Sequence, residues 1–511
     1  MLTVSLFDEG PPPPCPAPFN MAAYVLAHAA DRPGKIALSV VTPRGAERWS
    51  YARLEAAVRG TATGLLEMGL VPGDRVLMRL GNTVEFPILF LAALAVDLVP
   101  VPTSSQLTAA EVEKLLPGLA PALIVQGTGV AVPDDTPCPV LPASRLHDMH
   151  DNPPADYAMG DPGRLGYIIY TSGTSGQPRA VMHAHRAIWA RRMMWQGWYG
   201  LTEDDRLLHA GAFNWTYTLG TGLMDPWSVG ATALIPGAGA DRYSLPLLLR
   251  RYGATIFAAA PGVIRQIVET DADLHIPGLR HALSAGEKLP PAVAREWQDR
   301  SGTGIYEALG MSECSTFISG SPSNPPAQGS SGRPQPGRRV AVLSEETCQP
   351  VPVGTPGVLA VSKRDPGLML GYRGAEAETA ARFSGEWFLT GDTVAMAADG
   401  SVTYLGRDDD MMNAGGFRVS PLEVEAALTA HPAISEAAAT TVEIKAGAEV
   451  IAGFYAAETA LDAADLDAWC AARLARYKCP RLFVHLDALP KGANGKIRRK
   501  ALREGWKGHG T

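Results

Sequence analysis

The stretch Tyr170-Thr171-Ser172-Gly173-Thr174-Ser175-Gly176-Gln177-Pro178-Arg179 directly follows an apolar run, Gly166–Tyr170, that predicts a β-strand. Glycines in such a loop let backbone N–H groups approach phosphate oxygens, and the hydroxyl groups add further donors. Arg179 would then screen the phosphate charge. The loop lacks the GxxxxGK[ST] pattern of a Walker A loop. Taken alone, it is equally well an ordinary Ser/Thr/Gly turn.

Outward from this loop, strand and helix patterns alternate along most of the chain. Residues 75–80 predict a strand, and 51–68 predict a helix with Ser50 as its N-cap. The apolar window 86–101 predicts a buried helix after Asn82, with Glu85 closing a capping box. This alternation predicts an α/β fold with largely parallel sheets. The Ser-, Pro- and Gly-rich segment 321–337 predicts a long surface connection.

Composition excludes several classes of protein. A chain of 511 residues is too long for one compact core, so we expect at least two domains. A net charge of −7 and dispersed basic residues give no support for nucleic-acid binding. The 6 cysteines show neither a CxxC pair nor zinc spacing, which favours a reducing compartment. With no secretory signal and no window long enough to span a membrane, we expect a cytoplasmic protein.

A second boundary is predicted near Gly406–Asp410. Beyond it, Ser420-Pro421-Leu422-Glu423 combines an N-cap, a proline at the first helical position and a glutamate at the third. A helix is expected to start there. The remaining residues are enough for a small α+β domain.

The loop at Tyr170–Arg179 resembles the phosphate loop of the acyl-adenylate-forming superfamily, whose usual form is Tyr-Thr-Ser-Gly-Thr-Thr-Gly-x-Pro-Lys-Gly. Arg179 and Ala180 depart from the Lys and Gly of that form, although Arg keeps the charge and can bind phosphate bidentately. Five further segments resemble the family in the same order. The resemblance implies a large multi-layer N-terminal AMP-binding domain over residues 1–408, a hinge at Asp409 and a small mobile α+β domain over 409–511.

The resemblance also implies roles for individual residues. In Tyr306–Glu313, Ser312 would contact the α-phosphate and Glu313 would ligate Mg²⁺, with Leu309 where an aromatic residue is common. Lys496, in the loop Pro490–Ile497, would be the lysine needed for adenylation. The remaining implied nucleotide and CoA contacts are Thr171, Ser172, Gly173, Thr174, Ser175, Gly176, Glu307, Ala308, Leu309, Asp392, Arg407 and Arg418 for ATP or AMP, and Gly415 and Gly416 for the CoA tunnel.

Candidates for the acyl pocket give conflicting cues. The segment Ser284–Pro290 resembles benzoate- and aryl-CoA ligases, whereas Trp215–Trp227 resembles the acetyl- and medium-chain branch. No dedicated cation for a second carboxylate is evident, so a monoacid is preferred. The pocket candidates, which could equally be core residues, are Phe213, Trp215, Ser284, Ala285, Gly286, Gly310 and Met311.

The function that the resemblance implies is an ATP-dependent acid–CoA ligase. It would convert a small carboxylic acid through an acyl-AMP to an acyl-CoA, using ATP, Mg²⁺ and coenzyme A. Alternatives are a stand-alone enzyme that loads a carrier-protein phosphopantetheine, a luciferase-like oxidase, for which nothing indicates oxygen chemistry, and a nucleotide-binding sensor that has lost catalysis. A homodimer is compatible with the sequence, which does not determine the oligomeric state.

Overall fold

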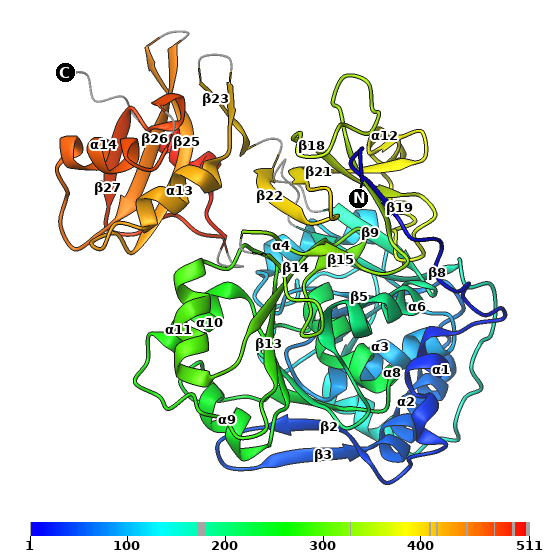
Figure 1. The fold of residues 1–511 in the computed structure, drawn as a ribbon. Coiled ribbons are helices and arrows are strands. Elements are labelled where there is room, and N and C mark those ends of the chain that lie inside the picture. The colour runs from blue at the N-terminus through cyan, green and yellow to red at the C-terminus, as the bar shows by residue number, and fades with distance from the viewer. Residues whose placement is uncertain are drawn as a thin grey trace. The chain divides into compact units, whose positions relative to one another are not determined.

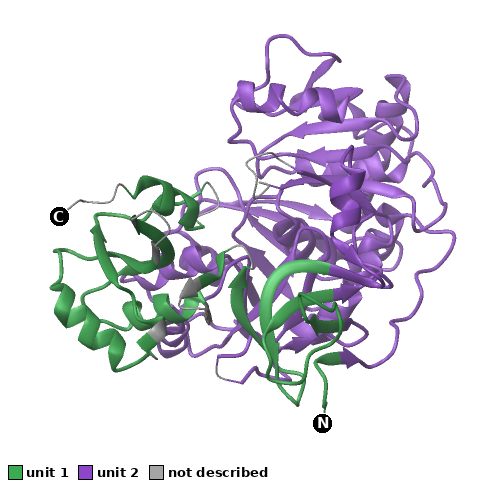
Figure 2. Cartoon of the chain, turned by 90° about the horizontal axis from the view of Figure 1, so that it is seen from above, with its two compact units in different colours: residues 1–6, 340–360, 389–511 green, residues 7–339, 361–388 purple. Residues whose placement is uncertain are grey.

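The structure, a computed structural model, describes residues 2–171, 179–327, 329–407, 410–414, 417–445, 448–474, 476–492 and 496–506. The chain divides into two compact units (Figure 2). Unit 1 comprises residues 1–6, 340–360 and 389–511, and unit 2 comprises residues 7–339 and 361–388. The predicted domain boundary at residues 408 and 409 lies outside the described residues and stays a prediction.

The largest described sheet belongs to unit 2 and has a parallel centre. In spatial order its strands are β16 (Arg333–Pro334), β15 (Ser315–Ser319), β14 (Ile305–Met311), β13 (His281–Ala285), β12 (Ile256–Ala258), β10 (Arg206–His209), β11 (Thr232–Pro236), β2 (Ile36–Val41) and β3 (Ala46–Ser50). The strands from β14 to β2 pair in parallel, whereas β15, β16 and β3 are antiparallel edges. Each parallel strand therefore ends at the same edge of the sheet.

Side chains alternate between the two faces of this sheet. Leu208, Phe257 and Ala282 pack against α9 (Leu245–Arg251), α10 (Pro261–Val268) and α11 (Pro291–Ser301), which lie beside β13 in Figure 1. Their neighbours Leu207, Ile256 and Leu283 belong to a second cluster on the other face. Consecutive residues of a strand point to opposite faces, so both faces are apolar and buried.

Unit 2 contains two further sheets. One is parallel: β5 (Val99–Pro102), β4 (Arg75–Arg79), β6 (Leu123–Gln126) and β7 (Val140–Pro142). The other is antiparallel: β19 (Gly371–Tyr372), β9 (Arg179–Ala184) and β8 (Leu165–Thr171). The remaining helices of unit 2 are α1 (Met21–Val25), α2 (Tyr51–Glu67), α3 (Glu85–Ala95), α4 (Ala109–Glu113), α5 (Leu116–Leu119), α6 (Ala187–Ala190), α7 (Arg192–Met194), α8 (Asp225–Ser228) and α12 (Glu376–Ala381).

Strands near the unit boundaries in the sequence form a six-stranded sheet. Its order is β1 (Leu6–Asp8), β17 (Arg339–Leu343), β18 (Gly357–Ser362), β21 (Trp387–Met396) and β20 (Phe383–Ser384), and β22 (Val402–Arg407) also pairs with β21.

The C-terminal part of unit 1 is a small α+β layer structure. Its sheet is β25 (Glu436–Lys445), β26 (Ala448–Ala456) and β27 (Leu482–Leu486), preceded by the hairpin β23 (Met412–Ala414) and β24 (Phe417–Val419). The helices α13 (Pro421–Thr429) and α14 (Ala463–Ala471) cover one face through Leu428 and Leu466. The opposite face packs on Leu502 of α15 (Arg499–Gly505). The α/β class and the small α+β part are confirmed.

Three local predictions need correction. Helix α3 does begin at Glu85, but Asn82 does not cap it, because its side chain instead bonds Gly211 O and Phe213 N. Helix α13 begins at Pro421 as predicted, yet the Ser420 hydroxyl donates to Leu405 O rather than capping the helix. The segment 321–337 is not wholly a surface connection, since Pro334 and Gln335 are buried and β16 joins the largest sheet. For Asn82 and Ser420, a tertiary hydrogen bond replaces the predicted local one.

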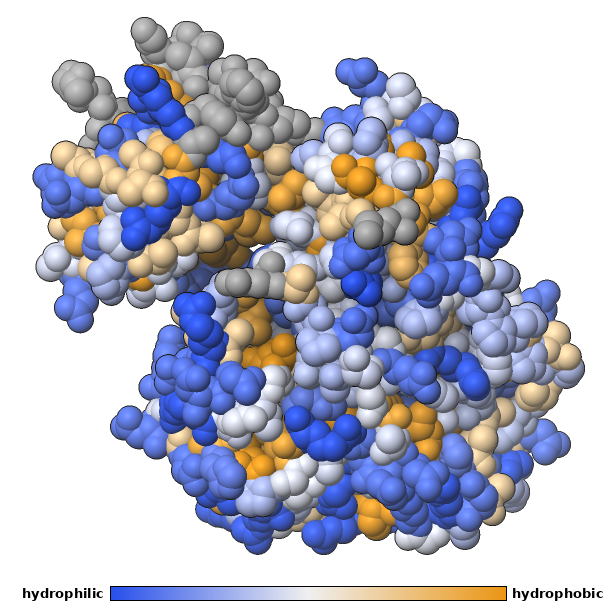
Figure 3. Space-filling model, viewed as in Figure 1, coloured by the Kyte–Doolittle hydropathy of each residue, from blue (hydrophilic) through white to orange (hydrophobic). Residues whose placement is uncertain are grey.

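Ser50 caps α2 as predicted, since its hydroxyl accepts from Arg53 N. None of the described helices is long and apolar enough to cross a membrane. The face shown in Figure 3 is mostly hydrophilic, with apolar residues dispersed over it.

A fully buried ion pair ties three segments of unit 2 together. Arg338 contacts both carboxylate oxygens of Asp365 at 2.5 and 2.6 Å and donates to Thr316 O at 3.0 Å. We predict that Arg338→Ala lowers the free energy of unfolding by about 3–5 kcal/mol, because it leaves the Asp365 carboxylate buried without its partner. Urea unfolding followed by tryptophan fluorescence measures this. The double variant Arg338→Met/Asp365→Leu should lose less than Arg338→Ala alone, and equal losses would contradict the explanation.

Candidate functional site

The predicted site residues of unit 2 gather where the parallel strands of the largest sheet end. Ser284 and Ala285 at the end of β13 pair in register with Glu307 and Ala308 of β14. Gly286 follows β13, and Phe213 and Trp215 follow β10. Ligands of open α/β sheets bind at this carboxyl edge. The parallel topology therefore brings together residues that are far apart in the sequence.

The turn that carries Ser312 and Glu313 is shaped by a close backbone contact. The β14–β15 register shifts between Leu309 and Gly310, and a Cβ on Gly310 would lie 2.3 Å from Ser315 O. Only glycine fits that approach. Ser315 itself adopts φ = 62°, which is unusual for a residue with a side chain.

Glu313 is linked to the end of the phosphate loop through Tyr372. Tyr372 donates its hydroxyl to Glu313 Oε1 at 2.7 Å, and the Arg179 guanidinium lies 5.4 Å from the centroid of the Tyr372 ring. Arg179 also pairs with Glu378. A cation and a carboxylate thus both contact one tyrosine.

The chemistry of Glu313 fits a magnesium ion shared with phosphates. Glu313 is 8% exposed, and Tyr372 occupies one of its two oxygens. Among the described residues, no group of three His, Cys, Asp or Glu could hold a metal. Mg²⁺ commonly binds through one carboxylate plus substrate phosphates rather than in a protein cage. The donor set at Glu313 matches that mode.

Other predicted residues of unit 2 are bound to neighbouring groups or buried in the core. Glu307 accepts from Leu289 N at 2.7 Å, and burial raises the pKa of its carboxyl group. Phe213 packs on Phe86 with ring centroids 5.2 Å apart and is a core residue. Ser284 is also fully buried.

In unit 1, Asp392 and Arg407 form a cross-strand pair on β21 and β22. Arg407 Nη1 lies 3.2 Å from Asp392 Oδ1 and donates to Thr390 O at 3.1 Å. The fold thus brings two predicted nucleotide contacts together. Lys496 is exposed in the same unit, and its carbonyl accepts from Gly492 N at 2.8 Å.

For two predicted residues the structure gives the strand and its pairing. Arg418 lies in β24, where its backbone pairs with Asn413. Thr171 ends β8 and pairs with Arg179. The predicted residues that lie outside the described part of the chain are Ser172, Gly173, Thr174, Ser175, Gly176, Asp409, Gly415 and Gly416.

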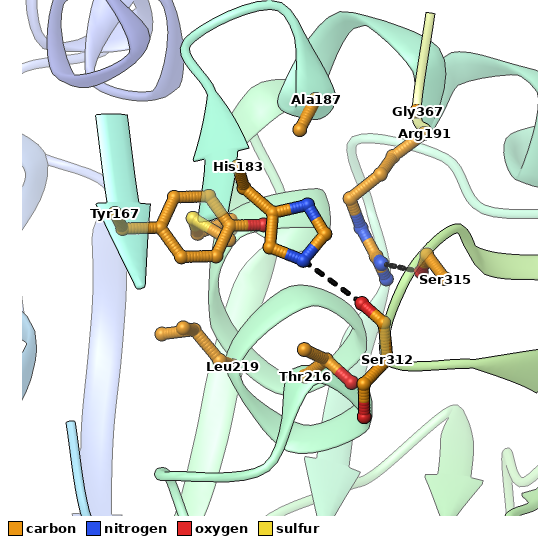
Figure 4. A pocket seen from close by; sticks show the side chains of 10 residues that line it. Tyr167, His183, Ala187, Arg191, Thr216, Leu219, Ser312, Ser315 and Gly367 are labelled. Atoms are coloured by element: carbon orange, nitrogen blue, oxygen red, sulfur yellow. Dashed lines mark hydrogen bonds between the residues drawn. The ribbon is translucent and has the colours of Figure 1, made fainter. Parts of the chain in front are cut away.

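A polar pocket lies beside Ser312, and most of the residues that line it were not predicted from the sequence. Figure 4 shows the side chains that define what we call the His183 pocket, which is lined by Tyr167, His183, Ala187, Arg191, Thr216, Leu219, Met224, Ser312, Ser315 and Gly367. Of the predicted site residues that the structure describes, Ser312 is the one in this lining. The volume of the His183 pocket, about 10 Å³, suits a single water or hydroxyl-sized group.

Arg191 is the buried cation of this pocket. It binds Asp225 through Nε at 2.8 Å and Nη2 at 2.6 Å, and it also donates to the Ser315 hydroxyl. Tyr199 donates to the same carboxylate at 2.7 Å. Although burial disfavours its charge, Asp225 holds the pKa of Arg191 above its usual value.

A glycine within a π-helix leaves room for this ion pair. The π-helix η4 runs from Thr218 to Met224, immediately before Asp225. A Cβ on its Gly220 would lie 2.1 Å from the Arg191 guanidinium carbon. π-Helical turns are rare and are frequent at functional sites. Arg191 and Asp225 are 34 residues apart, and no local periodicity signals their pairing.

Comparisons with known proteins agree with one another. Residues 25–373 match the AMP-binding enzyme family, and residues 423–496 match the AMP-binding enzyme C-terminal domain. The benzoate–CoA ligase of Thauera aromatica is 31% identical over 98% of this chain and 100% of its own length. The mitochondrial acyl-coenzyme A synthetase ACSM3 of Pongo abelii is 28% identical over 96% of this chain and 90% of its own.

A solved structure is similar throughout. The benzoate CoA ligase from Burkholderia xenovorans LB400 aligns with a TM-score of 0.85 and 28% identity, covering 95% of this chain and 100% of that one.

We predict that Gly220→Ala destabilises unit 2 by about 1–3 kcal/mol, because the added methyl group would overlap the buried Arg191 guanidinium. Thermal unfolding measures the loss. Gly118→Ala is the matched control, since Gly118 is exposed in α5 and a Cβ there meets nothing within 4 Å. Equal stability of both variants would contradict tight packing around Arg191.

Proposed function

Since the chain belongs to the AMP-binding enzyme family and is an AMP-forming acid–thiol ligase, we propose that it joins a benzoate-like or a short- to medium-chain monoacid to coenzyme A at the expense of ATP. The observation that carries this proposal is the Arg179–Tyr372–Glu313 arrangement at the end of the phosphate loop. It supports a site that gathers triphosphate charge beside Ser312.

The first step forms a mixed anhydride. A carboxylate oxygen of the acid attacks the α-phosphorus of ATP, the bond to the bridging oxygen breaks, and pyrophosphate leaves. Negative charge from two anions accumulates, so fixed cations and donors lower the barrier. Mg²⁺, when bound at Glu313, supplies further charge neutralisation on the phosphates.

Each residue has a distinct task in that step. Arg179 binds phosphate oxygens, and Ser312 donates to the α-phosphate. Lys496 bridges the acid and the α-phosphate as a protonated amine, not as a base. Asp392 accepts from the ribose hydroxyls, and an ionised carboxylate is a strong acceptor for them.

The second step transfers the acyl group. The thiolate of CoA attacks the acyl carbon, the acyl–phosphate bond breaks, and AMP leaves. A lysine at the reacting atoms would obstruct the thiol, so the small domain turns about Asp409 between the steps, and Gly415 and Gly416 leave space for the pantetheine chain.

We predict that Lys496→Ala lowers pyrophosphate release by at least about a hundredfold, because a charged donor is lost from the transition state. Formation of acyl-CoA from supplied acyl-AMP should be nearly intact. Lys500→Ala is the control, since Lys500 is an exposed lysine of α15 that is ion-paired with Glu504. Equal loss in both half-reactions would contradict the separate use of Lys496.

We also predict that Asp409→Pro spares adenylation and impairs thioester formation, because proline restricts the backbone rotation of a hinge. Single-turnover assays of the two steps measure the split. Asp409→Ala leaves the backbone free and should retain both steps. Normal overall turnover of the proline variant would contradict the assignment of Asp409 as the hinge.

An assay with free CoA as the acceptor distinguishes this function from the loading of a carrier protein.

A further inference from the structure

The His183 pocket contains a buried hydrogen-bond acceptor with no partner. His183 Nε2 lies 2.8 Å from Ser312 O, and a backbone carbonyl can only accept, so Nε2 carries the proton. Nδ1 then presents its lone pair, and it has no hydrogen-bond partner although the residue is 3% exposed. Buried polar atoms are ordinarily satisfied, so such an exception needs an explanation.

The orientation of His183 is set by its surroundings. Its ring stacks on Tyr167, with centroids 4.9 Å apart and planes 17° apart. Figure 4 shows the ring beside Tyr167 with one nitrogen directed at Ser312. Burial lowers the pKa of His183 to about 4, so its Nδ1 remains unprotonated near neutral pH. The acceptor is therefore a fixed feature of the pocket.

Arg191 does not make the pocket a site for a second carboxylate. Asp225 binds its guanidinium through both oxygens, and the hydroxyl groups of Tyr199, Thr221 and Ser315 accept further hydrogen bonds from it. Its charge is already neutralised within the protein. Because the lone pair at Nδ1 would also repel an anion, the pocket fits a neutral group.

The Ser315 hydroxyl adds a donor. Arg191 donates to Ser315 Oγ, which therefore keeps its own proton for another acceptor. Leu219, Met224 and Ala187 give the same pocket apolar walls. One acceptor, one hydroxyl donor and apolar walls together match a neutral polar substituent on a hydrocarbon group.

We propose that the His183 pocket receives the far end of the acyl group and selects an acid with a hydrogen-bond donor there, a hydroxyl or amino group that donates to Nδ1 of His183. This inference rests on the proposed function and narrows its substrate class. His183 is then a specificity-determining residue for the ligase reaction. Ser312 would then contact the α-phosphate through its side chain and orient His183 through its carbonyl oxygen.

Matched pairs of acids test the proposal. Each ring isomer of hydroxybenzoate and aminobenzoate is compared with its fluoro and methyl counterpart, and 6-hydroxyhexanoate with hexanoate, by kcat/KM of pyrophosphate release. At one position the donor acid should exceed its counterpart by on the order of tenfold to a hundredfold, because the counterpart leaves Nδ1 unsatisfied. Non-donor acids that equal or exceed their partners at every position would overturn the proposal.

Failure of this inference is separable from failure of the proposed function. If benzoate and hexanoate release pyrophosphate as well as their hydroxylated forms do, the ligase function stands and the selectivity is wrong. If no acid releases pyrophosphate, the proposed function itself fails, and the selectivity with it.

Two variants isolate the role of His183. In His183→Gln the side-chain amide can still donate to Ser312 O, but no acceptor remains at the Nδ1 position. The preference for the donor acid should fall to about onefold to threefold, mainly through a higher KM for that acid. His281→Gln is the control, because His281 is 2% exposed and lies outside the pocket lining. Its preference should equal that of the unaltered protein.

A preference unchanged in His183→Gln would overturn the assignment. A measurement on the unaltered protein avoids dependence on folding of the variant. The ¹⁵N resonance of His183 Nδ1 should move upfield when the donor acid binds and stay in place when its fluoro counterpart binds. No difference between the two acids would contradict the proposal.

Discussion

The ion pair between Arg191 and Asp225 holds together the segments around the His183 pocket. Arg191 follows α6, Asp225 begins α8 directly after η4, and Ser315 begins β15. Bulk water could not replace either partner, since Arg191 is 5% and Asp225 0% exposed. A buried charge without its partner is strongly destabilising, so these segments must keep their mutual positions.

The ion pair stabilises the walls of the pocket but leaves no unpaired charge for a ligand. Asp225 neutralises the Arg191 guanidinium. The groups left to bind a ligand are neutral: the lone pair on Nδ1 of His183 and the hydroxyl group of Ser315. Glu313 follows Ser312 in the chain, and Tyr372 contacts both Glu313 and Arg179, so charged groups lie close to these neutral ones. The turn between β14 and β15 therefore carries both Ser312, whose carbonyl accepts from His183, and Glu313, which accepts from Tyr372.

Sequence patterns predicted the elements whose signals are local. The strand before the phosphate loop, the helix capped by Ser50 and the proline-led start of α13 lie where expected. The caps assigned to Asn82 and Ser420 were wrong because each side chain found a partner elsewhere in the tertiary structure. A short polar side chain has several partners of similar energy, and sequence alone does not rank them. The edge strand β16 was not predicted, because its two residues are too few to show a periodic pattern.

By itself, the sequence determined the family, because its motifs follow one another along the chain in the family's order. It also determined the α/β class, since the alternation of strand and helix patterns is local. Only the tertiary structure decided the polarity of the pocket. Arg191 meets Asp225 across 34 residues, and His183 acquires a defined proton only through the carbonyl of Ser312. The partner of a buried charge and the position of the proton on a histidine depend on which groups become neighbours after folding. The spacing of residues along the chain does not predict either.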